Sequence, residues 1–142
     1  MGLPEYQPHR DREERISSAL LAIRAIVPLP LYPAHKRELL SVCIWKITEA
    51  DGKKKVRYWS EGAIWSDPKT LQHEHVVERK ELVSRLLAGD DPEQVVNDAV
   101  ACMVTPAEHS VLGKCGGSGW DRYAQASIRV YDSQNGVWKD DA

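Results

Sequence analysis

Phenylalanine is absent from the 142-residue sequence, and no apolar run approaches the roughly 18 residues needed to cross a bilayer. The N-terminal stretch MGLPEYQPHRDREER is polar and lacks the apolar segment of a secretory signal peptide. The only cysteines are Cys43, Cys102 and Cys115, an odd number that does not make a disulfide framework. We therefore expect a soluble cytoplasmic protein that has no membrane partner.

The sequence also lacks an excess of positive charge. It has 19 basic and 21 acidic residues, which give a net charge of −2. Proteins that bind nucleic acid without sequence preference usually carry a basic field, because phosphate contacts dominate their affinity. Any nucleic-acid binding by this chain therefore needs a local basic face.

The composition, with 42% apolar and 28% charged residues, is that of a globular protein. We expect a flexible lead-in over residues 1–10 and a single α+β domain over residues 11–142. Asp11 and Glu14 resemble a capping box, and an apolar stripe then predicts an amphipathic helix that ends at Pro28.

A β-hairpin is predicted next, with strands over 39–48 and 55–65. Both segments are rich in β-branched and aromatic residues, and Asp51-Gly52 between them is a turn signal. Lys53, Lys54 and Lys55 would then lie at the tip of the hairpin. We expect the N-terminal helix to pack on this hairpin.

Short elements fill the rest of the chain. The patterns predict strands over 72–77, 101–105 and 127–132, helices over 79–89, 91–99 and 120–126, and a turn at Asn135-Gly136. A further helix begins at Thr105-Pro106, with Thr105 as the N-cap and Pro106 at the first helical position.

Three of the five histidines lie in two short motifs, His73-Glu74-His75 on a predicted strand and His109 in the first turn of the helix after Thr105-Pro106. Strand alternation places His73 and His75 on one face and Glu74 on the other. If the strands over 72–77 and 101–105 pair, that helix carries His109 back over them, so imidazoles and a carboxylate gather at one place.

This order of elements resembles the ββα-metal, or HNH, nucleases. The segments EHVV and ACMVTPAEHSVL are similar to the module of this family, in which a strand that carries a histidine precedes a second strand and a helix with a metal-binding histidine. The second segment is most similar to colicin-type nucleases, whose second strand and helix run through a Val-Thr-Thr-Pro-like turn to a histidine three residues after the proline. The resemblance covers about residues 70–113, which would form a ββα-like module.

The resemblance implies a role for each matching residue. His75 matches the general base that takes a proton from the attacking water, Glu74 and His109 match metal ligands, and His73 is a possible further ligand. The implied cofactor is a divalent metal, Zn²⁺, Mn²⁺ or Mg²⁺. The family's asparagine position falls on Val100, so Asn97 one turn earlier is the candidate that orients the base.

The resemblance implies a small metal-dependent HNH-like endonuclease that acts on DNA or RNA. Arg79 and Lys80, at the start of a predicted helix, are candidate nucleic-acid contacts. The second hypothesis is a catalytically silent HNH-like interaction protein, such as a phage or mobile-element factor that binds a host defence or regulatory protein.

Other interpretations of these residues stay open at this point. The His pair also fits an ordinary polar strand edge, and His109 an ordinary first helical turn. Cys102, His109 and Cys115, together with His73 or His75, could form a zinc site, although buried free cysteines usually pack as small apolar groups. An aromatic surface over 120–123 with Trp138 could bind a ligand or cap the core.

Overall fold

The structure is a computed structural model that describes residues 2–141. The chain divides into two compact units, each assembled from separate stretches of sequence. The sheet unit takes the first residues up to Gln7, then Gly52–Val76, then the chain from Ala101 onward; the helical unit takes Pro8–Asp51 and Val77–Val100. The predicted α+β class is confirmed, whereas the single domain over 11–142 stays a prediction.

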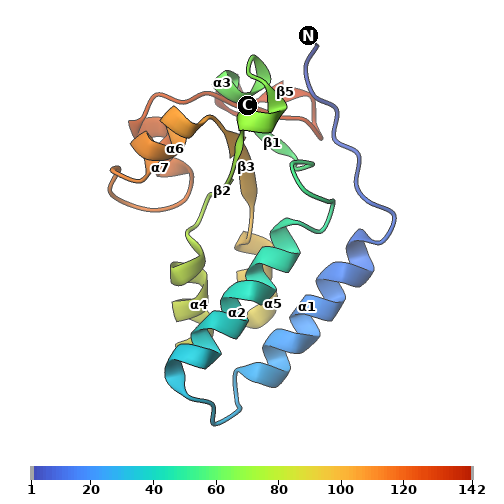
Figure 1. Ribbon diagram of the computed structural model, residues 1–142, viewed down its shortest axis with the longest axis vertical. Coiled ribbons are helices and arrows are strands. Elements are labelled where there is room, and N and C mark those ends of the chain that lie inside the picture. The colour runs from blue at the N-terminus through green and yellow to red at the C-terminus, as the bar shows by residue number, and fades with distance from the viewer. Residues whose placement is uncertain (1, 142) are drawn as a thin grey trace. The chain divides into compact units, whose positions relative to one another are not determined.

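Four helices form the helical unit: α1 (Arg12–Ile26), α2 (Pro33–Thr48), α4 (Arg79–Leu87) and α5 (Pro92–Asp98). Within this unit α1 lies beside α2, and α4 and α5 complete the bundle (Figure 1). All four helices contribute to one apolar core, whose fully buried members include Ile23, Leu40, Ile44, Leu82 and Val95. Burial of these side chains is the main favourable term for such a unit.

The predicted hairpin is wrong, because its first strand is the helix α2. Leu40, Cys43, Ile44 and Ile47 are buried at helical spacing and face the core shared with α1, so α1 packs on a helix and not on a hairpin. Tertiary burial here overrides the β propensity of the Val and Ile side chains. Pro33 starts the helix, where its missing N–H costs nothing.

The loop after α2 also differs from the predicted hairpin tip. Gly52 has φ +107°, a conformation that suits glycine, but it lies between α2 and β1 and joins no two paired strands. Lys54 donates from Nζ to the carbonyl oxygens of Pro68 and Lys69, at 2.8 and 3.2 Å. This lysine therefore closes a loop of the sheet unit.

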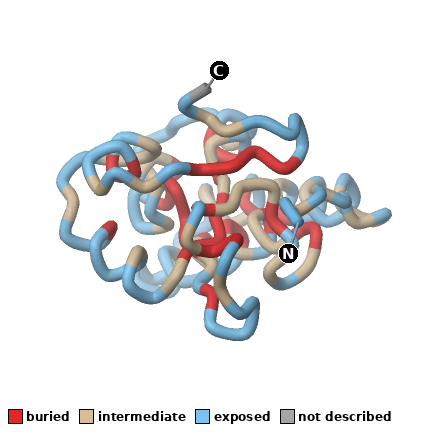
Figure 2. Tube along the Cα trace, turned by 90° about the horizontal axis from the view of Figure 1, so that it is seen from above, coloured by how far each residue is buried: buried red, intermediate tan, exposed pale blue. Residues whose placement is uncertain are grey.

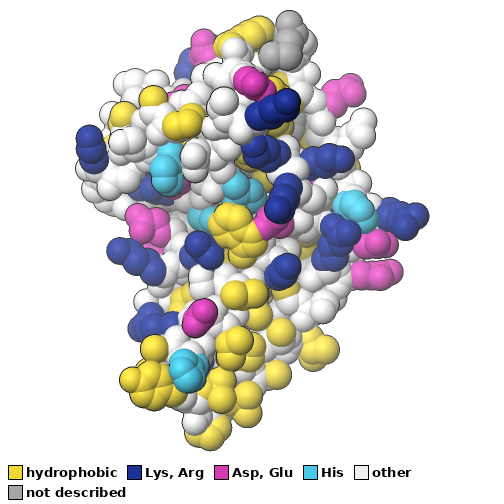
Figure 3. Space-filling model, in the orientation of Figure 1, with side chains coloured by type: hydrophobic (Ala, Val, Ile, Leu, Met, Phe, Trp, Pro, Cys, Tyr) yellow, Lys and Arg dark blue, Asp and Glu magenta, His cyan; other side chains and the backbone are white. Residues whose placement is uncertain are grey.

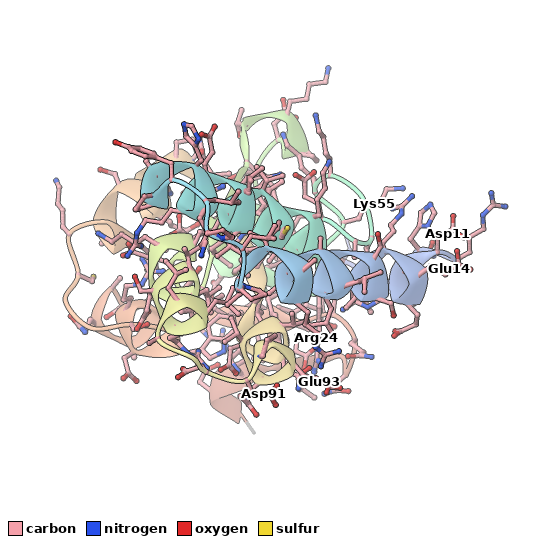
Figure 4. The ribbon with its side chains drawn as sticks, turned by 90° about the horizontal axis from the view of Figure 1, so that it is seen from below. Asp11, Glu14, Arg24, Lys55, Asp91 and Glu93 are labelled. Carbon is pink, nitrogen blue, oxygen red and sulfur yellow. The ribbon has the colours of Figure 1, made fainter. Side chains whose placement is uncertain are left out.

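The predicted capping box at the start of α1 is wrong as well. Asp11 is the N-cap but makes no side-chain capping bond; Figure 4 labels it beside Glu14 at this end of the helix.

Polar contacts also join the elements of the helical unit. At the other end of α1, Arg24 lies 3.8 Å from Glu93 of α5, and Figure 4 shows these two side chains together. The buried Asp51 accepts from Arg12 at 2.5 Å and from the backbone N–H of His9 at 2.9 Å.

Five strands form the mixed sheet of the sheet unit: β1 (Tyr58–Ser60), β2 (Gln72–His75), β3 (Ala101–Val104), β4 (Val130–Asp132) and β5 (Val137–Trp138). Their order is β2-β3-β1-β4-β5, with β1 parallel to β3 and every other pair antiparallel. All residues of β3 and β4, the two strands on either side of the central β1, are buried, and Figure 2 shows buried stretches of chain in red.

Short helices flank these strands: α3 (Glu61–Ile64), α6 (Pro106–Leu112) and α7 (Trp120–Gln125), with 3-10 turns η1 (Pro68–Thr70) and η2 (Lys139–Asp141). The predicted strands over 72–77, 101–105 and 127–132 are confirmed by β2, β3 and β4, and the predicted helices after them by α4, α5, α6 and α7. The sequence therefore predicted the second half of the chain well. In residues 2–141, no helix is long and apolar enough to span a membrane.

The first prediction separates the helix from the strand over residues 39–48. Val42 and Ile44 would share one face of a strand but lie far apart around a helix, and Val42 is 48% exposed whereas Ile44 is fully buried. We expect Ile44→Ala to lower the free energy of unfolding by about 2–4 kcal/mol and Val42→Ala by less than about 1 kcal/mol. Urea denaturation measures both, and equal losses would contradict the helix.

The second prediction concerns the ion pair between Arg57 and Asp132. Arg57 donates two bonds of 2.7 Å to the buried carboxylate, and this holds the pKa of Asp132 at about 2, below the ordinary 3.8. Because the folded-state pKa is lowered, the stabilisation is fully present above about pH 4 and is lost as the pH falls through 2. Solvent reaches the Arg57 side chain, which is 34% exposed, so we expect only roughly 1 kcal/mol.

Urea denaturation between pH 2 and pH 7 tests this linkage with Asp132→Asn as the comparison. We expect wild type to exceed the variant in unfolding free energy by a constant amount above pH 4, and the difference to shrink toward pH 2. A difference that does not change with pH would show that the carboxylate charge contributes nothing.

Candidate acid–base site

The helix that carries His109 is positioned by a complete capping box. Thr105 Oγ1 accepts from the backbone N–H of Glu108 at 3.1 Å, and Glu108 Oε1 accepts from the N–H of Thr105 at 2.8 Å. Pro106 occupies the first turn. The predicted N-cap is thus confirmed, and the reciprocal bonds fix where α6 leaves the end of β3.

The capping box is tied to the sheet through Ser60. Ser60, fully buried at the end of β1, donates from Oγ to Glu108 Oε1 at 2.6 Å and accepts from the N–H of Ala63 at 2.9 Å. A Cβ on Gly62 would lie 2.9 Å from Glu108 Oε2, so a side chain at this position would crowd the carboxylate. These contacts hold α6 in one orientation over the strands.

His109 and Glu74 meet across β2 and α6. The two strands β2 and β3 are antiparallel, with Glu74 opposite Cys102, and the Nδ1 atom of His109 makes a hydrogen bond with Glu74 Oε2. The Glu74 side chain is 10% exposed, whereas that of His109 is 54% exposed. The carboxylate is therefore held inside the protein, and the imidazole extends from it toward solvent. The prediction that His109 is aimed at the strand bearing Glu74 is confirmed.

The same carboxylate contacts a buried arginine from α7. Arg122, 1% exposed, lies with Nη1 at 3.4 Å from Glu74 Oε1. Its Nη2 donates to the carbonyl oxygens of His75 and Val76 at 2.9 and 2.7 Å, and Nη1 lies 3.5 Å from that of Leu112. A buried cation needs such partners, because desolvation without them is costly.

Two further buried groups lie on the Glu74 side of the sheet. The Cys102 thiol, fully buried beside Glu74 in the strand register, faces the hydroxyl of Tyr123 on α7. Burial raises the pKa of both groups, so each stays neutral at physiological pH. Cys43 and Cys102 are buried free thiols, as is usual for cysteines that pack as small apolar groups. A neutral, enclosed thiol is neither a nucleophile nor a ready metal ligand.

His73 and His75 occupy the other face of β2. Their rings are 5.1 Å apart and share the face predicted by alternation, and His75 is 7% exposed. Between the two histidine motifs, the contact that the structure forms is the one from His109 to Glu74, and His73 and His75 contact each other on the opposite face. Asn97 lies in α5, which belongs to the helical unit.

Arg79 and Lys80 also lie in the helical unit, at the start of α4. The Arg79 guanidinium stacks 4.6 Å above the centre of the Trp45 ring and donates to Ser41 Oγ at 3.2 Å. Lys80 is 86% exposed beside Glu78. With Arg37, these two cations line a shallow hollow; their predicted contact with nucleic acid stays a prediction.

The predicted divalent metal can be tested against the donors that the structure brings together. Glu74 and His109 supply one carboxylate and one imidazole, but they contact each other and Glu74 also contacts Arg122. No group of three His, Cys, Asp or Glu side chains that could hold an ion forms within residues 2–141. The alternative cysteine–histidine zinc set is likewise not assembled there. These residues do not by themselves fit a metal centre.

Sequence reasoning missed two residues of the site. Glu108 completes a Thr-x-x-Glu capping pattern that is visible in the sequence, so this signal was available. Arg122 carries no such signal, because only the return of α7 to β2 places its guanidinium against Glu74. Of the segment over 120–123, which could bind a ligand or cap the core, Arg122 and Tyr123 are buried, as a core cap requires.

Comparison of the chain with protein-family models, with curated proteins and with solved structures found no match.

The third prediction concerns the charge pair beneath His109. Glu74→Gln removes the carboxylate that faces the buried Arg122, so part of the desolvation cost of the guanidinium is no longer offset. We expect a loss of roughly 1–3 kcal/mol in the free energy of unfolding. The matched control is Glu61→Gln, because the Glu61–Arg129 pair is 48% and 44% exposed and should contribute less than about 1 kcal/mol. Urea denaturation compares the two, and similar losses would argue against a special role for Glu74.

Proposed function

We propose that the sheet unit is a ββα-type endonuclease that hydrolyses phosphodiester bonds of DNA or RNA. The observation that carries the proposal is the pair formed by Glu74 and His109 on an antiparallel β2–β3 unit followed by α6. The resemblance over residues 70–113 supplies the substrate class.

The pair has the arrangement of a general base with its orienting carboxylate. Glu74, held by Arg122, accepts the hydrogen bond from Nδ1–H of His109, and this tautomer leaves Nε2 unprotonated. Because the imidazole is half exposed, Nε2 is available to a substrate.

The proposed reaction uses these groups as follows. His109 Nε2 takes a proton from a water molecule, and the water oxygen attacks the phosphorus atom of the substrate. The bond from phosphorus to the leaving sugar oxygen breaks, and that oxygen takes up a proton from solvent. The base is assigned to His109 because it pairs with Glu74, whereas His75 is almost fully buried on the opposite face.

The fourth prediction tests this assignment. We expect wild type to cleave single-stranded DNA, duplex DNA or RNA, in EDTA or with Mg²⁺, Mn²⁺ or Zn²⁺, and His109→Gln to lower the rate at least about 100-fold. Gel analysis of labelled substrates measures the rate under each condition. The matched control is His35→Ala in the helical unit, which should cleave at the wild-type rate.

A parallel variant distinguishes the two histidine assignments. If His75→Ala abolishes cleavage and His109→Gln does not, the base is His75, as the family resemblance implies. If wild type cleaves none of the substrates under any of these conditions, the endonuclease proposal fails.

One observation favours the second hypothesis, an interaction protein without catalysis. Large apolar side chains are exposed on the helical unit, over α1, α2 and their connector: Leu21, Leu29, Tyr32, Leu39 and Val42. Figure 3 shows hydrophobic side chains gathered over this part of the unit. Exposed apolar clusters often mark protein-binding surfaces. Absence of cleavage, with a protein partner whose binding is weakened by Leu21→Glu, would support this function instead.

A further inference from the structure

A cavity of about 430 Å³ opens on the sheet unit beside α7. Its volume lies within the range of small-molecule sites. The wall combines an aromatic side, from Trp120 and Tyr123, with a polar side from the segment that follows α7 and from η2. The lining residues that matter here are Trp120, Tyr123, Arg129, Lys139 and Asp140.

Lys139 is held at this cavity by aromatic rings. Its Nζ lies 4.4 Å from the centre of the Trp120 ring and 5.4 Å from that of Tyr58. Trp120 in turn contacts the rings of Tyr58 and Tyr123, at centroid distances of 4.9 and 5.0 Å. The ammonium is therefore placed by cation–π contacts beside a broad aromatic surface.

The second cation of the cavity is already balanced by carboxylates. Arg129 stacks 4.3 Å above the Trp138 ring, and lies 3.2 Å from Asp140 and 3.5 Å from Glu61. Among the described residues, no carboxylate forms an ion pair with Lys139. Lys139 is thus the group of this cavity whose charge is best suited to an incoming anion.

We propose that this cavity binds one nucleotide, with its base against the aromatic side at Trp120 and its phosphate on Lys139. A flat base suits an aromatic wall, and stacking of this kind tolerates any base. The phosphate meets the ammonium of Lys139, which would repel a cationic ligand. The proposal rests on the proposed function only in taking nucleic acid as the source of the ligand.

The cavity is connected to the acid–base pair through α7. Trp120 and Tyr123 of this helix line the cavity, and Arg122 between them contacts Glu74, which holds His109. A nucleotide in the cavity would therefore lie against the same helix that orients the carboxylate. This makes the cavity a subsite that positions a strand, separate from the reacting groups.

Calorimetric titration with adenosine 5′-monophosphate tests the proposal without any cleavage step. We expect adenosine 5′-monophosphate to bind at least tenfold more tightly than adenosine, and more tightly than inorganic phosphate, because the site needs both parts of the nucleotide. Equal affinity for the nucleotide and the nucleoside would overturn the proposal.

Variants locate the binding. Lys139→Gln should weaken binding of the monophosphate about tenfold, whereas Lys114→Gln, an exposed lysine outside the cavity, should leave it unchanged. Trp120→Phe should keep binding within about threefold, and Trp120→Leu should lose it. If Lys139→Gln and Lys114→Gln bind adenosine 5′-monophosphate equally well, the cavity is not the nucleotide site. This conclusion holds even if the tryptophan variants fail to fold.

Separate measurements identify the source of the nucleotide and test the proposed endonuclease activity. A single-stranded oligothymidylate that binds more tightly than the monophosphate identifies a strand, and tighter binding of the monophosphate identifies a free nucleotide; both support the site. If the protein binds the nucleotide but cleaves no substrate, the nucleotide site stands and the endonuclease proposal fails. Cleavage by wild type without binding of the monophosphate or the oligothymidylate at Lys139 retains the endonuclease and removes this inference.

Discussion

A guanidinium buried inside the sheet unit is the constraint on which the candidate site depends. Arg122 is almost completely enclosed, and a charged group in such a place is stable only when carbonyls and carboxylates surround it. Its partners come from β2 and from the end of α6, so one side chain joins α7 to both. The Glu74 carboxylate is fixed as part of the same arrangement, and the orientation of His109 follows from it.

The two faces of the sheet carry different kinds of side chain, because successive residues of a strand point to opposite faces. Alternation along β2 sends Glu74 to the face covered by α6 and α7, and His73 and His75 to the face that contains the apolar side chains of Met103 and Ala101. On the first of these faces Glu74, His109 and Arg122 lie together. His73 and His75 lie on the opposite face and cannot join that group without a change in the strand, which is why the proposed base is His109.

A helix or strand could be predicted from the sequence where the residues that specify it lie close together along the chain. The start of α6 was evident because Thr105 and Pro106 act within one helical turn, and β3 was evident because ACMV is a short apolar run between turn signals. The segment over 39–48 was misassigned, because its β-branched residues and the later Asp-Gly pair favour a hairpin locally. Its helical spacing of buried residues becomes decisive only when α1 and α4 supply a surface to pack against.

The sequence alone determined the α+β class, the capped start of α6, and the opposite faces that Glu74 and its two neighbouring histidines take on β2. Each of these depends on residues a few positions apart, or on alternation that any strand must obey. Only the tertiary structure decided that Arg122 neutralises Glu74, that Ser60 supports the capping box, and that Lys139 lies over Trp120. Those contacts join residues 19 to 48 positions apart, and no local pattern specifies which distant side chain will fill a buried space.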